Sequence, residues 1–296
     1  MTKTAFIAIV GRPNVGKSTL LNAILGEKVA IVSKKPQTTR NRITGIYTKD
    51  EDQIVFLDTP GMHRPRTKLG DFMVKTTGST IGEADAAILV VEPREAVGDV
   101  EDGLIAQFKK RRLPAILVIN KIDAVSPVNV ARTIEAYAAA FDFAAVVPIC
   151  AKNGKGVDSV LEECKAFLSS SVWYFPGDIV TDQPERQIAA EIIREKLLRT
   201  LDEEIPHGTA VVIEEFKEED KLIRIRAEIF CEKNSHKGII IGKHGAALKQ
   251  IGTYARQDME AFFDTKVFLD LWVKVKENWR DSVGSLHNFG FNGDEI

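Results

Sequence analysis

The feature of this chain that most limits its possible folds is a glycine-bounded loop directly after an apolar run near the amino terminus. The run covers residues 6–10, and the loop at 11–18 reads Gly-Arg-Pro-Asn-Val-Gly-Lys-Ser, which fits the pattern G-x-x-x-x-G-K-[ST]. In this pattern the glycines let backbone N–H groups turn inward toward phosphate oxygens, and the next helix presents its N-terminus to the anion. The sequence therefore predicts a strand, a phosphate-binding loop and a helix over 19–25, in an α/β protein that binds a nucleoside triphosphate.

Side chains of this loop have separate predicted roles. Lys17 would bring positive charge to the β- and γ-phosphates, and Ser18 would offer its hydroxyl to a magnesium ion. A lysine and a hydroxyl at the start of a helix are therefore the chemical core of the predicted site. The residues expected to contact phosphate are Gly11, Asn14, Val15, Gly16, Lys17, Ser18, Thr19 and Gly61.

A second motif indicates which base is bound. Asn120-Lys121-Ile122-Asp123 follows another apolar run and fits the pattern N-K-x-D. The Asp123 carboxylate can accept hydrogen bonds from both the ring N–H and the exocyclic amine of guanine, a contact that adenine cannot make. Asn120 would tie this loop to the phosphate-binding loop, and the stem of Lys121 would lie over the base. A backbone N–H at Ala151 would meet the guanine oxygen. The predicted guanine-binding residues are Asn120, Lys121, Asp123, Ala151 and Lys152.

Two further loops are predicted to hold magnesium and to sense the γ-phosphate. Asp58 ends an apolar run, where its carboxylate would hold magnesium through water, and Gly61 would bring its N–H to the γ-phosphate. Thr39 lies in an upstream loop and would reach the same ion. The sequence does not identify the group that positions the attacking water. The expected magnesium residues are Ser18, Thr39 and Asp58; the expected switch residues are Thr38, Thr39, Asp58, Thr59, Pro60, Gly61 and Met62; the expected catalytic residues are Lys17 and Thr39.

Each of these motifs alone could be an ordinary turn after an ordinary strand, but their order and shared position favour one nucleotide site. The arrangement resembles the translation-factor-type GTPases, and the Asn-Val-Gly-Lys-Ser and Thr-Thr-Arg segments resemble the Era-like branch. The resemblance implies GTP hydrolysis, with Mg2+ as cofactor and GTP and GDP as ligands. Some members of this branch bind a potassium ion (K+) beside the phosphates, for which Asn14 is the candidate ligand. Ras-like enzymes carry a water-orienting glutamine where this chain has Met62, so slow intrinsic hydrolysis is expected.

The apolar runs also predict the architecture of the amino-terminal part. Runs rich in β-forming residues near 5–10, 53–58, 86–91, 115–120 and 145–150 alternate with helical patterns. Continuous apolarity indicates burial on both faces, and hence a mostly parallel sheet with helices on both faces. Turn-forming residues then mark a linker. The expected divisions are an α/β P-loop GTPase domain at 1–173, a linker at 174–183, a smaller α+β domain at 184–282 and a flexible tail at 283–296.

The carboxyl-terminal part shows a different order of elements. Residues 185–201 have apolar side chains at helical spacing, whereas 209–216 and 222–231 alternate like the strands of a hairpin around the acidic turn 217–220. Two helices and a strand over 266–276 follow. The predicted order is therefore α-β-β-α-α-β.

Between those two helices lies Gly242-Lys243-His244-Gly245, a GXXG loop. In KH domains such glycines let a nucleic-acid backbone approach closely, and Lys243 would meet a phosphate. No acidic residue occurs over 233–257, so positive charge is concentrated here although the net charge of the chain is −2. A lone GXXG usually means a pair of helix-capping glycines, but the order of elements and the acid-free window favour RNA binding. The expected RNA-binding residues are Lys237, Gly238, Ile241, Gly242, Lys243, His244, Gly245 and Lys249.

The domain at 184–282 is thus expected to be an α+β type II KH domain. A GTPase followed by a KH domain resembles the Era family of bacterial GTPases over essentially the whole chain. The resemblance implies that the partner is the 3′ end of 16S ribosomal RNA (rRNA), within the maturing small (30S) ribosomal subunit. It also implies weak peripheral association with the inner membrane. We expect a cytoplasmic monomer with no signal peptide and no membrane span, and the three scattered cysteines fit a reducing compartment.

Two alternatives remain open from the sequence. One is an RNA-binding protein whose nucleotide domain is structural and does not cycle, and the other is an Era-branch GTPase that acts on a different RNA. A metabolic nucleotide enzyme is disfavoured by the guanine motif and the KH order. Histidines offer no competing chemistry: His63 is interpreted as a solvated loop residue, and His236 and His244 lack partners at metal-ligand spacing.

Overall fold

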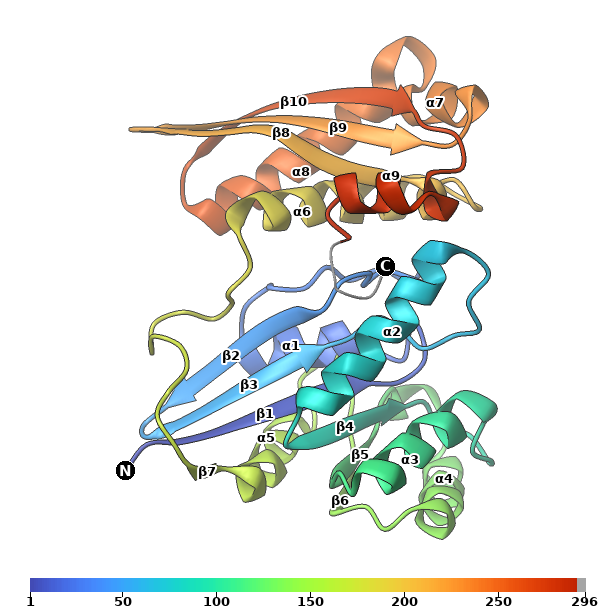
Figure 1. The fold of residues 1–296 in the computed structure, drawn as a ribbon, viewed down its shortest axis with the longest axis vertical. Helices are drawn as coiled ribbons and strands as arrows, with labels where there is room; N and C mark the ends of the chain where they lie inside the picture. Colours follow the sequence, from blue (N-terminus) through green and yellow to red (C-terminus); the bar gives the residue numbers. More distant parts are fainter. Residues whose placement is uncertain (292–296) are drawn as a thin grey trace. The chain divides into compact units, whose positions relative to one another are not determined.

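The computed structural model describes residues 1–291, which form two compact units (Figure 1). The first unit comprises Met1–Pro65 and Met73–Asp182. The second comprises Arg66–Phe72 together with the described residues from Gln183 onward. Each unit is built around its own cluster of buried apolar side chains.

The first unit is built on a seven-stranded, mostly parallel sheet. Its strands are β1 (Lys3–Val10), β2 (Ile43–Lys49), β3 (Asp52–Asp58), β4 (Ala86–Val91), β5 (Ala115–Ile119), β6 (Ala145–Pro148) and β7 (Ser169–Ser170). Their order across the sheet is β2-β3-β1-β4-β5-β6, and β7 pairs with β1. All neighbours from β3 to β6 are parallel, whereas β2 and β7 are antiparallel to their partners. The predicted mostly parallel sheet is confirmed.

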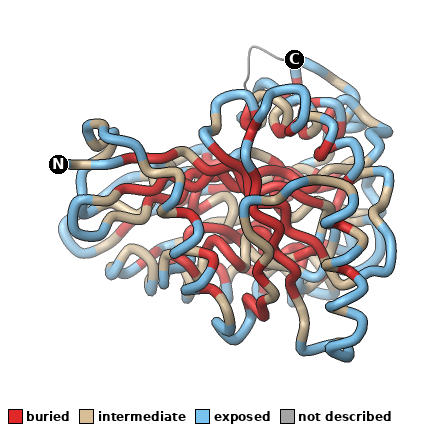
Figure 2. The backbone as a smooth tube through the Cα atoms, turned by 90° about the horizontal axis from the view of Figure 1, so that it is seen from below, coloured by how far each residue is buried: buried red, intermediate tan, exposed pale blue. Residues whose placement is uncertain are grey.

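Helices cover both faces of this sheet. Successive residues of β1 face opposite layers, because Ile7 and Ile9 join the buried cluster that includes Leu20, whereas Ala8 and Val10 join a second cluster. Burial on both faces explains why β1 reads as a continuous apolar run. The residues of β1, β3, β4 and β5 are mostly buried, and Figure 2 colours such buried residues red along the chain. The helices are α1 (Lys17–Leu25), α2 (Lys68–Glu83), α3 (Asp99–Arg111), α4 (Pro127–Ala140) and α5 (Val157–Cys164), with short 3₁₀ turns at Ile122–Ala124 and Lys165–Phe167.

The sequence pattern predicts no strand where β2 forms. In the structure, β2 pairs with β3 along its whole length, from Ile43 opposite Asp58 to Lys49 opposite Asp52. The segment contains threonines, a tyrosine and a glycine, so it lacks the continuous apolar run that marks the parallel strands. Pairing with a neighbour along the chain, rather than its own pattern, makes this segment a strand.

The linker predicted at 174–183 is wrong for most of its length. Gln53 Nε2 on β3 donates to Phe175 O at 2.9 Å, and Thr181 Oγ1 donates to Thr44 O on β2 at 2.7 Å. These bonds hold the segment beside the antiparallel edge of the sheet. The segment therefore belongs to the first unit, except for its last residue, Gln183, which belongs to the second unit.

The second unit has the predicted order α-β-β-α-α-β. Strand β9 is central, antiparallel to β8 and parallel to β10. Alternate residues of β9, such as Ile225 and Ala227, are buried in the cluster shared with the helices, as expected when one sheet face packs on them. Strand β8 continues to Glu219, so the hairpin turn is tighter than the predicted 217–220. The elements are α6 (Glu185–Thr200), β8 (Ala210–Glu219), β9 (Leu222–Cys231), α7 (Asn234–Ile241), α8 (Ala246–Phe263) and β10 (Lys266–Val275), with 3₁₀ turns at Pro206–Gly208, Lys243–Gly245 and Trp279–Asp281.

The flexible tail predicted at 283–296 is wrong for the residues that the structure describes. Helix α9 forms over Val283–Asn288. Leu286 is fully buried, and Phe291 is only 6% exposed. These apolar side chains anchor the segment, because leaving them in water would be unfavourable. Residues 292–296 lie outside the described residues.

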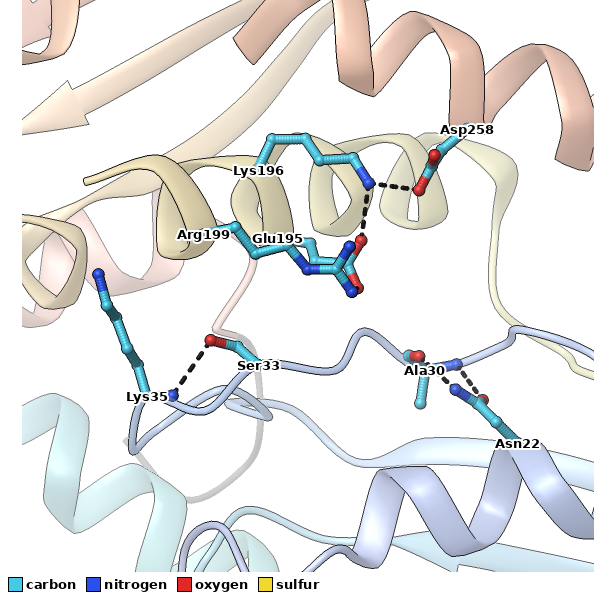
Figure 3. A network of polar contacts seen from close by, with 8 residues as sticks. All are labelled: Asn22, Ala30, Ser33, Lys35, Glu195, Lys196, Arg199 and Asp258. Carbon is cyan, nitrogen blue, oxygen red and sulfur yellow. Dashed lines mark hydrogen bonds and ion pairs between the residues drawn. The ribbon is translucent and has the colours of Figure 1, made fainter. Parts of the chain in front are cut away.

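Helix α6 carries a buried ionic cluster that its apolar pattern does not predict (Figure 3). Lys196 is 4% exposed, and its Nζ donates to Glu195 Oε2 at 2.9 Å and to Asp258 on α8. Glu195 is fully buried and also accepts from Arg199 at 2.9 Å. Because carboxylates surround the buried ammonium, its charge is compensated without water. The cluster links α6 to α8.

Replacing Lys196 by methionine should destabilise the second unit, because Glu195 and Asp258 lose their shared ammonium. We expect the free energy of unfolding to fall by about 3 kcal/mol, the usual effect of breaking a buried pair, measured by urea denaturation. Arg224→Gln is the control, because Arg224 pairs with Glu219 at the surface, and it should cost less than about 1 kcal/mol. Equal effects of the two changes would show that burial adds nothing to the Lys196 cluster.

Candidate nucleotide site and GXXG loop

The phosphate-binding loop between β1 and α1 requires glycine at two positions. Gly11 has a φ of 147°, and a Cβ there would lie 2.3 Å from Val90 O on β4. Gly16 has a φ of 102°, and a Cβ there would lie 2.1 Å from Asn120 Nδ2. Both the backbone conformation and the available space therefore exclude a side chain. The chain then enters α1 at Lys17.

Lys17 is buried within this loop. Its Nζ donates to Gly11 O at 3.2 Å and to Arg12 O at 2.9 Å. Burial lowers the pKa of Lys17 to about 8, and the charge of Asp58 opposes this shift. A buried ammonium that is held only by neutral carbonyls would gain by binding an anionic oxygen instead.

The three predicted magnesium residues lie together beside Lys17. Ser18 Oγ donates to Asp58 Oδ2 at 2.6 Å and lies 2.9 Å from Thr39 Oγ1. Burial raises the pKa of Asp58 to about 6, against the opposing charge of Lys17. Within residues 1–291, the buried Asp58 Oδ1 has no hydrogen-bond partner, a costly arrangement unless a donor or a cation faces it. Two hydroxyls and this carboxylate fit Mg2+, which prefers oxygen ligands and retains water.

The loop after β3 is anchored at its start and packed against the phosphate-binding loop further on. Thr59 is fully buried, and its Oγ1 donates to Ile9 O on β1 at 2.8 Å. A Cβ on Gly61 would lie 2.6 Å from Pro13 Cα, so these two backbones are in close contact. The Met62 side chain packs against the apolar core of the first unit. Of the predicted switch residues, Thr59 is thus a buried anchor, whereas Gly61 touches the phosphate-binding loop.

The remaining predicted switch residues make local contacts. Thr38 Oγ1 donates to Lys35 O at 2.7 Å, which folds the turn that precedes Thr39. Pro60 O accepts from Thr77 Oγ1 on α2 at 3.2 Å. Both loops therefore have defined conformations next to the magnesium residues.

Asn120 joins the guanine loop to the phosphate-binding loop, as the sequence predicts. Its Nδ2 donates to Val15 O at 2.8 Å, and its Oδ1 accepts from Ala151 N at 2.9 Å. Asn120 is 3% exposed, so neither bond competes with water. The Ala151 N–H that is predicted to meet the guanine oxygen is therefore already bonded, and guanine would have to share it.

Lys121 and Asp123 extend from the same loop after β5. Lys121 Nζ donates to Asn14 O at 2.7 Å and pairs with Glu92. The lysine stem thus spans from the guanine loop to the phosphate-binding loop, as expected for a side chain that lies over a base. Asp123 and Lys152 are exposed, so both are accessible to a ligand at this edge of the sheet.

The sequence does not predict two contacts near this site. Gln37 Nε2 lies 3.2 Å from His63 Nε2, and His63 Nδ1 lies 3.0 Å from Gly61 O. The interpretation of His63 as a solvated loop residue is therefore wrong. Arg12 pairs with Glu101 on α3 at 2.6 Å, and Glu101 is 2% exposed. No motif spacing signals these pairs, because the partners are 26 and 89 residues apart.

In the second unit, the GXXG loop connects α7 to α8 as predicted. Gly242 has a φ of 73°, and a Cβ there would lie 2.7 Å from Ala247 Cβ. Gly245 has a φ of 79° and open space where a Cβ would be. Lys243 and His244 are both exposed. The loop thus offers two basic side chains beside an open backbone, the features that a phosphate backbone needs for close approach.

The other predicted RNA-binding residues lie on the two flanking helices. Lys237, Gly238 and Ile241 are on α7, and Lys249 is on α8. Gly238 and Lys249 are exposed, whereas Lys237 and Ile241 are half-buried. Ile240 packs in the core, so α7 is anchored while its basic and glycine positions remain accessible.

Residues 1–291 contain neither a membrane-spanning helix nor a cluster of metal-binding side chains. No helix in that range is long and apolar enough to cross a bilayer. The same range contains no group of three or more His, Cys, Asp or Glu side chains that could hold a metal ion. The three cysteines are buried free thiols.

These features define a class of protein, a P-loop GTPase that carries a KH domain. Residues 6–121 match the family described as 50S ribosome-binding GTPase, and residues 204–280 match the KH domain family. The chain is 49% identical over 290 residues to GTPase Era of Ruminiclostridium cellulolyticum, which covers 98% of this chain and 97% of that protein. It is 50% identical over 292 residues to GTPase Era of Clostridium kluyveri, and the match covers 98% of this chain and 100% of that protein.

Two solved structures of Era are similar over the same length. A crystal structure of Era in complex with MgGDPNP and nucleotides 1506–1542 of 16S rRNA has a TM-score of 0.94 and 39% identity, covering 99% of this chain and 100% of that chain. A variant of Aquifex aeolicus Era bound to GDP and AlF4− matches with the same values. The chain belongs to the Era family of GTPases, and the reaction that it catalyses is the hydrolysis of GTP.

Asp123→Asn should change the base preference of the nucleotide site. The amide places a donor opposite the guanine amine, so GTP should bind about 10- to 100-fold more weakly, the range for one hydrogen bond to a charged group. Xanthosine triphosphate carries a carbonyl in place of that amine and should then bind better than GTP. Competition against labelled GTP measures both affinities. Asp142→Asn, an exposed change in the same unit, is the control, and unchanged preference for GTP in the Asp123 variant would contradict the assignment.

Proposed function

We propose that this chain is a GTP-dependent switch that binds the 3′ end of 16S rRNA through its KH domain and acts in assembly and rRNA maturation of the small ribosomal subunit. The observation that carries the proposal is the presence, in one chain, of a guanine-nucleotide motif set and an open GXXG loop. Supporting evidence is the near full-length likeness to an Era structure in complex with 16S rRNA nucleotides.

In the proposed cycle, the phosphates of GTP bind over Gly11 to Thr19, and Lys17 exchanges its carbonyl partners for β- and γ-phosphate oxygens. Ser18, Thr39 and, through water, Asp58 would hold Mg2+, which would supply positive charge beside the phosphates. The γ-phosphate orders the loops at Thr39 and Gly61, and hydrolysis releases them. Burial of Asp58 and Lys17 supports these roles, because charges in a water-poor site act strongly on a ligand.

Guanine is read by the loop after β5. Asp123 accepts from the two guanine donors, Lys121 lies over the base, and Ala151 and Lys152 contact the guanine oxygen side. The exposure of Asp123 and the bridging position of Lys121 support this assignment. Asn120 acts indirectly, by holding the loops together.

RNA binds along the GXXG loop. Lys243 and His244 contact phosphates, the loop glycines allow the backbone to approach, and unstacked bases lie along α7 over Gly238 and Ile241. Lys237 and Lys249 extend the positive surface on either side of the loop. The acid-free stretch over 233–257 supports this path, since a phosphate backbone meets no repelling carboxylate there.

A direct test is binding of a labelled RNA that carries the 16S 3′ end, compared with a scrambled RNA of equal length, in GDP and in a non-hydrolysable GTP analogue. The proposal expects preference for the 16S sequence and an affinity that differs between nucleotides. Equal affinity in both nucleotides without phosphate release would favour the alternative of a structural, non-cycling nucleotide domain. Preference for another RNA would favour a different substrate within the same family.

We also propose that the chain works in the cytoplasm as a monomer, with weak peripheral association with the inner membrane. Resemblance to the Era family supports these points. Sedimentation measures the oligomeric state, and flotation with anionic lipid vesicles measures membrane association. A protein that stays with the soluble fraction in both GDP and GTP states would remove membrane association from the proposal.

Replacing Lys243 and His244 together by aspartate should weaken RNA binding by at least about tenfold at moderate salt, because both positions then repel phosphate. The remaining binding should depend less steeply on salt. Both glycines stay in place, so the fold and the GTP affinity should be unchanged. Lys221→Asp, an exposed change in the β8–β9 turn, is the control. A binding curve for the double variant that overlays the wild type would place the RNA site elsewhere.

Potassium dependence is a separate expectation that concerns Asn14. This residue has a φ of 64°, and its Nδ2 donates to Lys34 O at 2.7 Å, so its amide joins the phosphate-binding loop to the loop before Thr39. A potassium ion bound by the Asn14 oxygen would add positive charge beside the phosphates. Hydrolysis should then be faster in potassium than in sodium chloride at equal ionic strength, and Asn14→Ala should remove the difference. Equal wild-type rates in both salts would exclude the ion.

A further inference from the structure

Gln37 and His63 form a hydrogen-bonded bridge between two loops that the known motifs do not account for. Gln37 Nε2 lies 3.2 Å from His63 Nε2, and His63 Nδ1 lies 3.0 Å from Gly61 O. Both side chains are half-buried. The bridge therefore runs from the loop before Thr39 to the loop after β3.

The chemistry of the three groups fixes the direction of both bonds. The Gly61 carbonyl can only accept, so His63 Nδ1 must carry the proton. In a neutral imidazole the other nitrogen, Nε2, is then an acceptor, and the Gln37 amide N–H donates to it. The chain Gln37–His63–Gly61 is thus fully satisfied without rearrangement.

The peptide group between Gly61 and Met62 is held from both sides. Met62 N–H donates to Gly11 O in the phosphate-binding loop at 3.1 Å, and the oxygen of the same peptide accepts from His63. The close packing of Gly61 on Pro13 further restricts this peptide group. His63 therefore restrains the peptide directly after the Gly61 N–H, which is the group that meets the γ-phosphate in the proposed site.

The Gln37 end of the bridge is also restrained. Gln37 has a φ of 57°, a left-handed conformation that a non-glycine residue adopts at a cost and keeps only where its surroundings require it. It stands two residues before Thr39, whose hydroxyl lies 2.9 Å from Ser18 Oγ. Strain at Gln37 thus coincides with a side-chain bond to the opposite loop.

We propose that His63 and Gln37 are positioning residues for GTP hydrolysis, which hold the Gly61–Met62 peptide and couple the Thr39 loop to the Gly61 loop. The inference rests on the proposed roles of Thr39 and Gly61. The bridge then has a specific task, because the partly buried Met62 packs against the apolar core and carries no polar group that could order the reacting region. The bridge acts on hydrolysis and not on nucleotide affinity.

Two isosteric variants separate the two hydrogen bonds. His63→Asn keeps a nitrogen near the place of Nδ1 and can still donate to Gly61 O, whereas His63→Gln keeps one near the place of Nε2 and can still contact Gln37. His63→Ala loses both. Single-turnover hydrolysis should fall about three- to tenfold in His63→Ala, the effect of one or two neutral hydrogen bonds. His63→Asn should recover part of the rate, and the dissociation constants for GTP and GDP should stay within about twofold.

A double-mutant cycle with Gln37→Ala tests the coupling between the two loops. If the residues act as one bridge, the double variant with His63→Ala should be no slower than the worse single variant. Arg64→Ala is the control, because Arg64 neighbours His63 in sequence and its side chain is exposed. Wild-type hydrolysis in His63→Ala, or fully additive losses in the cycle, would overturn the proposal.

Failure of the bridge and failure of the nucleotide site give different results. If Thr39→Ala abolishes hydrolysis while His63→Ala and Gln37→Ala do not slow it, the site stands and the bridge has no role. If Thr39→Ala leaves hydrolysis unchanged, the proposed site itself is wrong. If His63→Ala does not fold, Gln37→Ala and His63→Asn still measure each end of the bridge.

Discussion

The nucleotide site depends above all on the two hydrogen bonds of the Asn120 side chain. Its amide nitrogen holds the phosphate-binding loop at Val15, and its oxygen holds the third loop at Ala151. Gly16 has no side chain because that amide occupies the space. One buried group with a donor at one end and an acceptor at the other therefore joins three loops from separate strand ends. A side chain that can only accept hydrogen bonds, or that can make no hydrogen bond, could not replace Asn120 without leaving a buried polar group unpaired.

Much of the fold could be predicted because burial leaves a mark on local sequence. Strands β1, β3, β4 and β5 are buried on both faces, so they read as apolar runs. Segment Ile43–Lys49 becomes a strand by pairing with β3, and residues 174–182 are held by scattered polar bonds such as those of the Gln53 side chain. Neither kind of contact leaves a periodic pattern in the sequence. Helix α9 could not be predicted for a related reason, because its few apolar residues form too short a pattern to indicate a helix.

The site could be predicted where one short segment contains the whole chemistry. The loops at 11–18 and 120–123 carry their ligand groups within a few residues, so spacing identifies them. The bridge from Gln37 to His63 and the pair of Arg12 with Glu101 could not be predicted, because each joins residues that only the fold brings together. The ionic cluster on α6 could not be predicted for the same reason. Helical spacing assigns charged residues to the surface, whereas Lys196 is buried because Asp258 on α8 compensates its charge.

The anchoring of Thr59 on β1 has a consequence for timing. Both its N–H and its hydroxyl donate to Ile9 O, so Asp58 belongs to the rigid sheet, and a large change in the loop can begin only after Thr59. In the proposed cycle, the carboxylate that would face Mg2+ then stays in place when the γ-phosphate leaves and the Gly61 backbone relaxes. Relaxation of the loop and departure of the diphosphate would therefore be separate events. Under that cycle, the chain would pass through a state that has already lost its active conformation while its nucleotide is still bound.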